Sequence, residues 1–396
     1  MRLCITGAGV VSAIGLGKEE TRVSLLENRS GVGPVRILHT TLPELPAGEV
    51  KLTNEAMMSL LGIPEGTVST RSSLMGTLAL KEALEQAGLG PEDIHKAVLV
   101  NGTTVGGMDK SEQYYLDFIS DRPDHTEYIP VHDCGATTEL ISKYFGGFAL
   151  STTISTACSS AANAIILGGN LIRSGRAEIV AVGGTECLSD FHINGFNTLM
   201  ILDKDRCRPF DATRAGLNLG EGAGFLIIES EASATKRGAK PLAWLDGYGN
   251  ACDAFHQTAS SPDGEGAFLA MSKALKMAGL APSDIDYINA HGTGTPNNDA
   301  SESAAMRRVF GDALPPVSST KSLTGHTTSA TGSIEAVICM LAMQGGFIPA
   351  NDGWNQADPD CIVPQATVCT GATLRHVICN SFGFGGNDSS LLLSAQ

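Results

Sequence analysis

The chain has 396 residues, of which 42% are hydrophobic and 17% charged, and its formal net charge is −15. That length suits two domains or one large duplicated domain, and the apolar content excludes wholesale disorder. The negative charge disfavours nucleic acid and anionic membrane surfaces as partners, and no apolar run reaches the roughly 18–20 residues of a membrane span.

The N-terminal segment favours neither a secretory signal nor a nucleotide site. Residues 1–7, MRLCITG, turn Gly-rich without a compact apolar region and cleavage site. The run TGAGVVS at 6–12 looks like a dinucleotide loop, but it lacks the third glycine of that fingerprint. The ten cysteines form no C-x-x-C pair, which disfavours zinc-ribbon and thioredoxin-type sites. We therefore expect reduced thiols in a cytoplasmic protein, with one or two of them chemically special.

A repeated segment predicts an internal duplication. Residues 83–94 read ALEQAGLGPEDI, and residues 274–285 read ALKMAGLAPSDI. Eight of the twelve positions are identical, whereas composition alone would give roughly one. Each copy predicts a helix end, a glycine cap, a proline turn and then a strand, at 96–100 and at 287–290. The alternative is two unrelated α/β domains that share one chance helix and turn.

Weaker echoes extend the repeat along the chain. A strand at 153–157 enters an alanine-rich helix, and residues 318–321 lead to a helix around 335–343. A third parallel joins the strands 178–182 and 376–380, each followed by a glycine pair. We therefore predict two α/β halves related by a pseudo-twofold axis, residues 1–240 and 241–396, packed as one body. Residues 108–144 are the least regular stretch, and we predict that they form an inserted segment on the surface.

Cys158 is the first candidate for chemistry. It lies in STACSSAA, where a predicted strand ends and small residues open a helix. A thiol at the positive end of a helix dipole is expected to have a lowered pKa and to favour the thiolate. The alternative is a buried structural cysteine, the commoner fate of a lone thiol.

Two histidines follow strands of the second half. His291 lies in NAHGTGTP and His326 in TKSLTGHTT. Neutral imidazoles can donate hydrogen bonds to a developing oxyanion, or they can bind metal. No H-E-x-x-H pattern accompanies them. Lys321 and Glu335 flank His326, either as an ion pair that orients its loop or as a turn residue and a solvent-facing helix residue.

The last candidate is the loop NSFGFGGND at 380–388. Its glycines allow the backbone to approach a ligand closely and to donate N–H groups. The alternative is a glycine-rich connection whose phenylalanines pack inward.

Together these segments resemble one family. The sequence runs that carry the resemblance are TGAGVVSAIG (6–15), STACSSAANA (155–164), GGTE (183–186), RPFDATRAGLNLGEGAGFLIIE (208–229), NAHGTGTPNND (289–299), STKSLTGHTTSATG (319–332) and NSFGFGG (380–386). In this order they resemble the β-ketoacyl-acyl-carrier-protein synthases, condensing enzymes of the thiolase fold. The resemblance spans nearly the whole chain and implies a thiolase-like α/β fold with duplicated halves in α-β-α-β-α layers.

The resemblance also implies roles for individual residues. Cys158 resembles the nucleophile that takes the acyl chain, and His291 and His326 resemble the pair that assists decarboxylation and stabilises the enolate. Lys321, with Glu335, looks like the support of the second histidine. Phe384 matches the family's gating phenylalanine, and its backbone N–H would form an oxyanion hole together with that of Cys158. Two further acids, Asp299 and Glu302, match the family pattern and are taken as structural.

The implied reaction is a ping-pong, decarboxylative Claisen condensation that adds two carbons, in fatty-acid or in polyketide or polyene biosynthesis. Its partners are an acyl carrier protein and a second subunit, as a homodimer or as a heterodimer with a related ketosynthase, and no metal or cofactor is needed. The alternatives are a thiolase-like acyltransferase and a non-catalytic subunit of a ketosynthase heterodimer. Carrier docking would need a local basic patch, for which the candidates are Arg71, Lys204, Arg206 and Arg208.

Two departures from the family pattern bear on specificity. The final loop reads GGND at 385–388, where the family commonly has Gly-Gly-Thr-Asn. Residues 108–111 read MDKS, whereas fatty-acid members tend to be more apolar there. This favours a specialised substrate over an ordinary long fatty chain.

Overall fold

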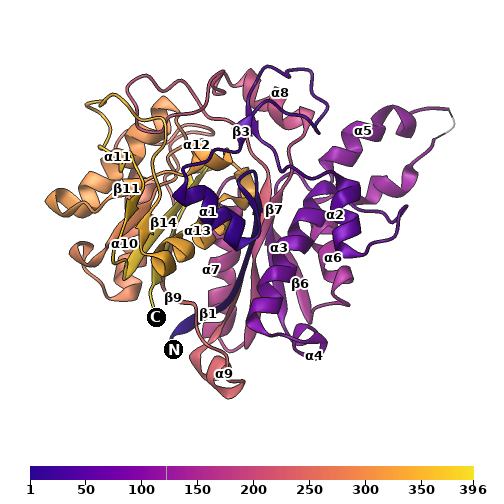
Figure 1. Ribbon diagram of the computed structural model, residues 1–396, viewed down its shortest axis with the longest axis horizontal. Helices are drawn as coiled ribbons and strands as arrows, with labels where there is room; N and C mark the ends of the chain where they lie inside the picture. Colours follow the sequence, from indigo (N-terminus) through magenta and orange to yellow (C-terminus); the bar gives the residue numbers. More distant parts are fainter. Residues whose placement is uncertain (122) are drawn as a thin grey trace.

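The computed structural model describes residues 1–121 and 123–396. A large mixed sheet runs through the molecule in the order β11-β10-β14-β15-β9-β1-β8-β7-β5-β6 (Figure 1). Its first five strands in sequence are β1 (Leu3–Ser12), β5 (Val98–Gly102), β6 (Leu150–Ile154), β7 (Ile179–Glu186) and β8 (Gly222–Ser230). The later five are β9 (Ala243–Cys252), β10 (Tyr287–Asn289), β11 (Val317–Ser318), β14 (His376–Gly383) and β15 (Asn387–Ser394).

The two sets of five strands have the same topology. In each set the second strand runs parallel to the third and fourth, the fourth is antiparallel to the fifth, and the fifth is antiparallel to the first. The sets join where β1 and β9 pair, at Cys4 with Trp244 and Ile5 with Ala243. The predicted duplication is thereby confirmed. The division of the chain between residues 240 and 241 stays a prediction.

Helices cover and separate the two sets, which gives the predicted α-β-α-β-α layers. The outer helix on the first set is α3 (Arg71–Ala87), and those on the second are α10 (Glu265–Ala278) and α11 (Pro296–Phe310). Between the sets lie α7 (Ser160–Arg173) and α13 (Thr331–Gly345), which contact strands of both (Figure 1). Three apolar clusters fill the spaces between these layers, and burial of their side chains is the main stabilising contribution.

The repeated sequence forms the same local structure twice. Helix α3 is capped by Gly88 with φ 66° and α10 is capped by Gly279 with φ 69°, the left-handed conformation that favours glycine. In the short helix that follows each, α4 (Pro91–Ile94) or η2 (Pro282–Asp284), an aspartate accepts the capping N–H. Asp93 accepts from Gly90 at 3.1 Å and Asp284 accepts from Ala281 at 2.8 Å.

Paired glycines explain how closely the outer helices approach. A β-carbon on Gly7 of β1 would lie 2.1 Å from the Ala83 carbonyl oxygen of α3. A β-carbon on Gly247 of β9 would lie 2.2 Å from the Ala274 carbonyl oxygen of α10. Gly7 is therefore a packing residue inside a strand, as the absence of a full dinucleotide fingerprint in the sequence suggested.

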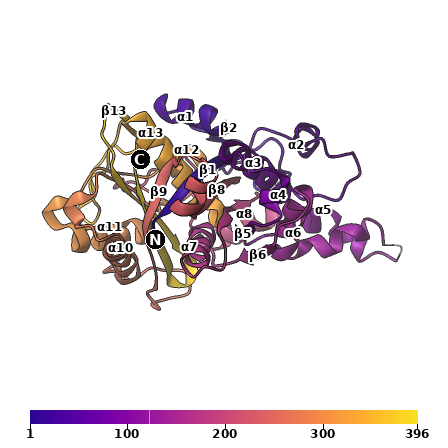
Figure 2. The same cartoon turned by 90° about the horizontal axis from the view of Figure 1, so that it is seen from below.

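The stretch 108–144 lies at the surface, as predicted, but the prediction that it is the least regular was wrong, since much of its described part is helical. It contains α5 (Met108–Phe118), η1 (Thr126–His132) and α6 (Cys134–Tyr144). No residue of α5 is fully buried, because this part projects from the body (Figures 1 and 2). A projecting helix does not need a continuous apolar stripe, and the periodic signal that identifies a helix is therefore weak.

Smaller elements complete the described chain. The helices are α1 (Lys18–Leu26), α2 (Asn54–Leu61), α8 (Asp190–Thr198), α9 (Glu231–Lys236), α12 (Lys321–Thr324), η3 (Gly311–Ala313), η4 (Thr328–Ala330) and η5 (Phe384–Gly386). The short strands are β2 (Gly15–Leu16), β3 (Val32–Gly33), β4 (Ala47–Gly48), β12 (Phe347–Ile348) and β13 (Cys369–Thr370). No helix among residues 1–121 and 123–396 has the length and apolar character to span a bilayer, and all ten cysteines are free.

Candidate active site

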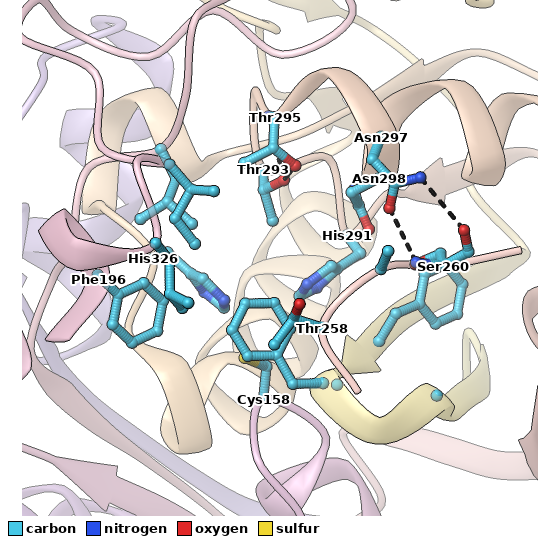
Figure 3. Close-up of a pocket in the computed structure, with 18 of the residues that line it drawn as sticks. Cys158, Phe196, Thr258, Ser260, His291, Thr293, Thr295, Asn297, Asn298 and His326 are labelled. Carbon is cyan, nitrogen blue, oxygen red and sulfur yellow. Dashed lines mark hydrogen bonds between the residues drawn. The ribbon is translucent and has the colours of Figure 1, made fainter. Parts of the chain in front are cut away.

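A cavity of about 330 Å³ brings the two halves of the chain together. Cys158 of the first half lies at its base, below the rings of His291 and His326 from the second half (Figure 3). Phe384 also lines it. Polar residues also line it, among them Thr258, Ser260, Thr293, Thr295, Asn297 and Asn298 (Figure 3).

A tight turn presents the Cys158 thiol. Strand β6 ends at Ile154, three residues before the predicted end at residue 157. Ala157 then adopts φ 51°, an uncommon conformation for a residue with a side chain. The Ser160 hydroxyl stabilises the turn, since it accepts the Thr156 N–H at 2.9 Å and donates to the Ala157 carbonyl at 2.6 Å. The strain is thus held in place by local hydrogen bonds directly before α7.

Burial dominates the chemistry of this thiol. It raises the pKa of Cys158 to about 12, although the Lys321 charge and the Phe384 N–H act in the opposite direction. The expectation that the helix N-terminus lowers this pKa was wrong, because desolvation of the thiolate in the cavity is the larger effect. Cys158 is a protonated thiol at neutral pH and must lose its proton during any reaction in which it attacks.

The two histidines form a neutral pair. Their ring centroids are 5.1 Å apart and the rings are nearly perpendicular, at 82°. Burial, reinforced by the Lys321 charge, lowers the pKa of each well below the ordinary value of 6.5. Nδ1 of His326 lies 3.0 Å from the Thr331 hydroxyl. Nδ1 of His291 is buried and has no hydrogen-bond partner within the described part of the chain.

Lys321 and Glu335 form a buried ion pair, so they are not a turn residue and a solvent-facing helix residue. The Lys321 ammonium lies 2.6 Å from Oε1 of Glu335, and the two residues are 1% and 2% exposed. Burial raises the pKa of Glu335 to about 7, against the effect of the Lys321 charge. The same charge lowers the pKa of Cys158, His291 and His326, so one ammonium influences the whole cavity.

Two buried acids hold the loop that carries His291. Glu302 accepts the backbone N–H groups of His291 at 2.9 Å and Gly292 at 2.8 Å. Asp299 accepts the N–H of Thr293 at 3.1 Å. Burial raises the pKa of Glu302 to about 7. These contacts are with the backbone, so both acids shape the loop after β10 from one face of α11.

Phe384 contributes a backbone donor and a ring. Its N–H faces the Cys158 thiol and lowers the pKa of that group. Its ring stacks on Phe196 of α8, with centroids 5.9 Å apart. Phe196 was missed from the sequence, because a single aromatic residue in an exposed helix belongs to no recognisable motif.

Asn387 is a second residue that sequence reasoning left without a role. Its Oδ1 accepts from the Ser159 hydroxyl at 2.9 Å and from the side-chain amides of Asn163 at 2.8 Å and Asn250 at 2.9 Å. These partners lie beside Cys158, in α7 and in β9. The departure at positions 387–388 provided the signal, since an unusual residue beside a functional loop needs its own partners.

Glu186 ends the GGTE run and was also given no role. It accepts the N–H groups of Thr104 and Val105, each at 2.9 Å, and the hydroxyl of Ser329, three residues after His326. Glu186 therefore connects the turn after β5 to η4, close to the histidines.

The proposed basic patch is only partly available. Arg71 is buried, donates to Glu221 at 2.8 Å and to the Leu52 carbonyl at 2.9 Å, and was wrongly assigned to a docking surface. Arg208 and Arg206 lie 3.3 Å and 2.7 Å from aspartates, and Lys204 is exposed. Within residues 1–121 and 123–396 no three His, Cys, Asp or Glu side chains are grouped as metal ligands.

Comparison with known proteins identifies the family. The family model described as Beta-ketoacyl synthase, N-terminal domain matches residues 1–234, and the one described as Beta-ketoacyl synthase, C-terminal domain matches residues 242–354. Nodulation protein E of Rhizobium meliloti (strain 1021) is 35% identical, with 98% of each chain covered. The 3-oxoacyl-[acyl-carrier-protein] synthase 2 of Staphylococcus aureus (strain N315) is 33% identical, covering 99% of this chain and 97% of the relative.

Solved structures show the same fold. The ishigamide ketosynthase/chain length factor matches with a TM-score of 0.91 and 33% identity, covering 100% of this chain and 99% of the other. The ketosynthase ApeO, solved with its chain length factor ApeC from Xenorhabdus doucetiae, matches with a TM-score of 0.84 and 30% identity, covering 100% and 98%.

The duplicated layers and the thiol beside two neutral imidazoles define an acyl-transferring condensing enzyme of the thiolase fold. More particularly, the chain belongs to the β-ketoacyl synthase family.

Proposed function

We propose that this chain joins an acyl group bound to Cys158 to a malonyl unit carried by an acyl carrier protein, with loss of carbon dioxide and extension by two carbons. The observation that supports this most strongly is the meeting of Cys158, His291 and His326 at one cavity. Membership of the β-ketoacyl synthase family supports the reaction class.

Loading is the first half of the reaction. The Cys158 sulfur attacks the carbonyl of the acyl thioester, and the bond to the carrier's phosphopantetheine sulfur breaks. The Cys158 proton passes by way of a neutral imidazole to the leaving thiolate. The backbone N–H groups of Cys158 and Phe384 form the oxyanion hole for the tetrahedral intermediate, in keeping with the approach of the Phe384 N–H to this thiol.

Condensation is the second half. The carbon–carbon bond to the malonyl carboxylate breaks and carbon dioxide leaves, while the electron pair moves into an enolate whose oxygen is bound by His291 and His326. If the Thr331 hydroxyl donates to Nδ1 of His326, Nε2 carries the hydrogen that it can donate. The enolate carbon then attacks the thioester, and the released Cys158 sulfur takes up one proton from solvent. In this scheme Lys321 and Glu335 position His326, while Asp299 and Glu302 hold the His291 loop.

The cofactor and partner proposals follow from the same chemistry. We propose that no metal or organic cofactor takes part, since phosphopantetheine carries both substrates. The chain would act in the cytoplasm, as a homodimer or paired with a related ketosynthase subunit, in a fatty-acid or polyketide-type pathway. Lys204 and Arg206 are the remaining docking candidates, because both side chains are exposed and their loop continues from Ile201, which lines the cavity.

The alternative, a non-catalytic subunit of a heterodimer, fits less well. Such a subunit has no need of an attacking thiol. Here the thiol and both imidazoles line one cavity, and the buried Lys321–Glu335 pair is present as well.

Intact-protein mass tests the proposal. Wild type, Cys158→Ala and Cys4→Ala are mixed with a panel of acyl-carrier proteins. Cys4 is a matched control, since it is another buried thiol whose pKa burial raises to about 12. We expect a thioester adduct on wild type and on Cys4→Ala only, and the best-loaded acyl group identifies the substrate class. An adduct that persists in Cys158→Ala, or no adduct with any acyl group, would contradict the proposal.

A further inference from the structure

Two acidic side chains meet behind the turn that carries the Phe384 N–H. Asp388 is the second residue of β15 and is 4% exposed. A β-carbon on Gly266 of α10 would lie 2.2 Å from Oδ2 of Asp388 and 2.9 Å from the β-carbon of Asp253. Both side chains therefore fill the space that this glycine leaves open.

Asp253 is tied directly to the turn. Its backbone N–H donates to the Gly386 carbonyl at 3.0 Å, and a β-carbon on Gly386 would lie 2.3 Å from its Oδ1. Its carboxylate also accepts the N–H of Phe255 at 3.0 Å and of Ser261 at 2.9 Å. Asp253 thus holds the segment 253–261 against the turn 384–386, and the Gly385 N–H adds a hydrogen bond to the Gln257 carbonyl at 2.8 Å.

The charges near Asp388 are mostly negative. Burial raises the pKa of Asp388 to about 8, and the nearby acids Asp253 and Glu302 add to this effect. On α10, the Lys273 ammonium donates to the Asn250 carbonyl at 2.8 Å. Glu265 pairs with Arg308 at 2.6 Å. Both cations are engaged elsewhere, so an ionised Asp388 would face two other carboxyl groups.

We propose that Asp388 is a positioning residue, whose neutral carboxyl lets the segments 253–261 and 384–388 pack together and so keeps the Phe384 N–H at Cys158. When Asp388 ionises, a second negative charge lies against Asp253, and the turn is released. This inference deepens the proposed function, since it rests on the Phe384 N–H serving the oxyanion. It also gives a reason for an aspartate at a place where the family pattern commonly has asparagine.

A pH profile tests the inference. We expect the kcat of wild-type condensation to fall above about pH 8, by about tenfold per pH unit as for a single ionisation. Asp388→Asn has nearly the same shape but cannot ionise, and we expect that fall to disappear. Asp263→Asn is the control, because Asp263 is an exposed acid beside α10, and it should follow wild type. Parallel falls in wild type and Asp388→Asn would overturn the inference.

Hydrogen exchange observes the two segments without relying on catalysis. Wild type and Asp388→Asn are compared at pH 6.5 and pH 9, with correction for the intrinsic rate at each pH. We expect faster exchange of the segments 253–261 and 384–388 in wild type at pH 9 alone. A difference of equal size at both pH values would indicate a merely structural role and overturn the inference. Release of the segments without any loss of condensation would overturn the link to the Phe384 N–H, while Cys158 loading would still test the reaction itself.

Discussion

The two halves of the chain share one order of strands but carry different chemistry at equivalent places. The third strand of the first half, β6, leads to Cys158, whereas the third strand of the second half, β11, leads to Lys321 and His326. The second strand of the second half, β10, leads to His291. Its counterpart in the first half, β5, leads to a turn that contains threonine and glycine. A duplicated scaffold thus brings strand ends to one place, and the loops alone decide what each half contributes.

The two halves hold an equivalent loop with residues from different elements. The loop after each second strand is held by a buried carboxylate that accepts two consecutive backbone N–H groups. In the first half this is Glu186, which accepts from Thr104 and Val105 and comes from the end of β7. In the second half it is Glu302, from helix α11. Equivalent loops therefore need equivalent acceptors, even when the acceptors come from different elements.

The largest expected effect compares the buried ion pair of each half. Lys321→Ala and Arg71→Ala each leave a buried glutamate without its cation, Glu335 or Glu221, which should cost about 3–5 kcal/mol of unfolding free energy. Urea denaturation measures this cost. We expect condensation to fail in Lys321→Ala even at temperatures where it stays folded, whereas folded Arg71→Ala remains active.

A double substitution separates stability from chemistry at Lys321. Lys321→Met with Glu335→Leu replaces the pair by apolar groups of similar volume and should recover most of the lost stability. Recovered stability together with recovered condensation would show that the pair serves the fold alone.

The next prediction separates the roles of Cys158 and of the two histidines by reaction step. Cys158→Ala should abolish acyl loading, whereas His291→Ala and His326→Ala should each slow malonyl decarboxylation by about 10²–10³-fold, the usual cost of losing one oxyanion donor. Mass spectrometry follows loading and carbon dioxide release follows decarboxylation. One imidazole also relays the Cys158 proton during loading, so we expect a smaller loss of loading in at least one histidine variant. If both histidine variants lost loading as severely as decarboxylation, the assignment of decarboxylation to the histidine pair would be wrong.

The sequence predicted most of this arrangement, because the features that carry it are local. The repeat at 83–94 and 274–285 marked the same helix, cap and strand in each half, and glycines at the helix ends need left-handed angles wherever they occur. Cys158, His291 and His326 each follow a strand, and the strand order then brings them to one cavity.

What the sequence could not provide depends on contacts across the fold. Whether Cys158 has a raised or lowered pKa is a balance between helix position and burial, and only the packed cavity shows that burial is larger. Arg71 was assigned to the surface because an arginine usually lies there. Its partner Glu221 is 150 positions away in the chain, and no local pattern connects the two.

A smaller effect tests whether the outer helices α3 and α10 pack equally tightly on their strands. Gly7→Ala and Gly247→Ala would place a β-carbon 2.1 Å and 2.2 Å from a helix carbonyl oxygen, and we expect each to cost about 1–3 kcal/mol through overpacking. Gly195→Ala is the control, since its β-carbon would meet nothing within 4 Å. Thermal unfolding of the three variants measures the effect, and a large difference between Gly7→Ala and Gly247→Ala would show that the duplicated packing is not equivalent in energy.

The smallest predicted effect concerns the positive charge of Lys321, a residue of the second half that acts on Cys158 of the first half. Lys321 lowers the pKa of His291 and His326, in addition to burial, and it also lowers the pKa of Cys158. Lys321→Met removes that charge, so all three pKa values should rise. NMR titration of the histidine Cε1–H signals should show that His291 and His326 of the wild type stay neutral down to well below pH 6.5. In Lys321→Met both histidines should titrate at a higher pH than in the wild type. The thiol changes in the unfavourable direction, because a higher pKa makes deprotonation of Cys158 harder. Titration of either wild-type imidazole at its ordinary pKa would contradict this prediction, because it would show that water reaches the cavity. The Lys321 ammonium would then have no detectable effect on Cys158.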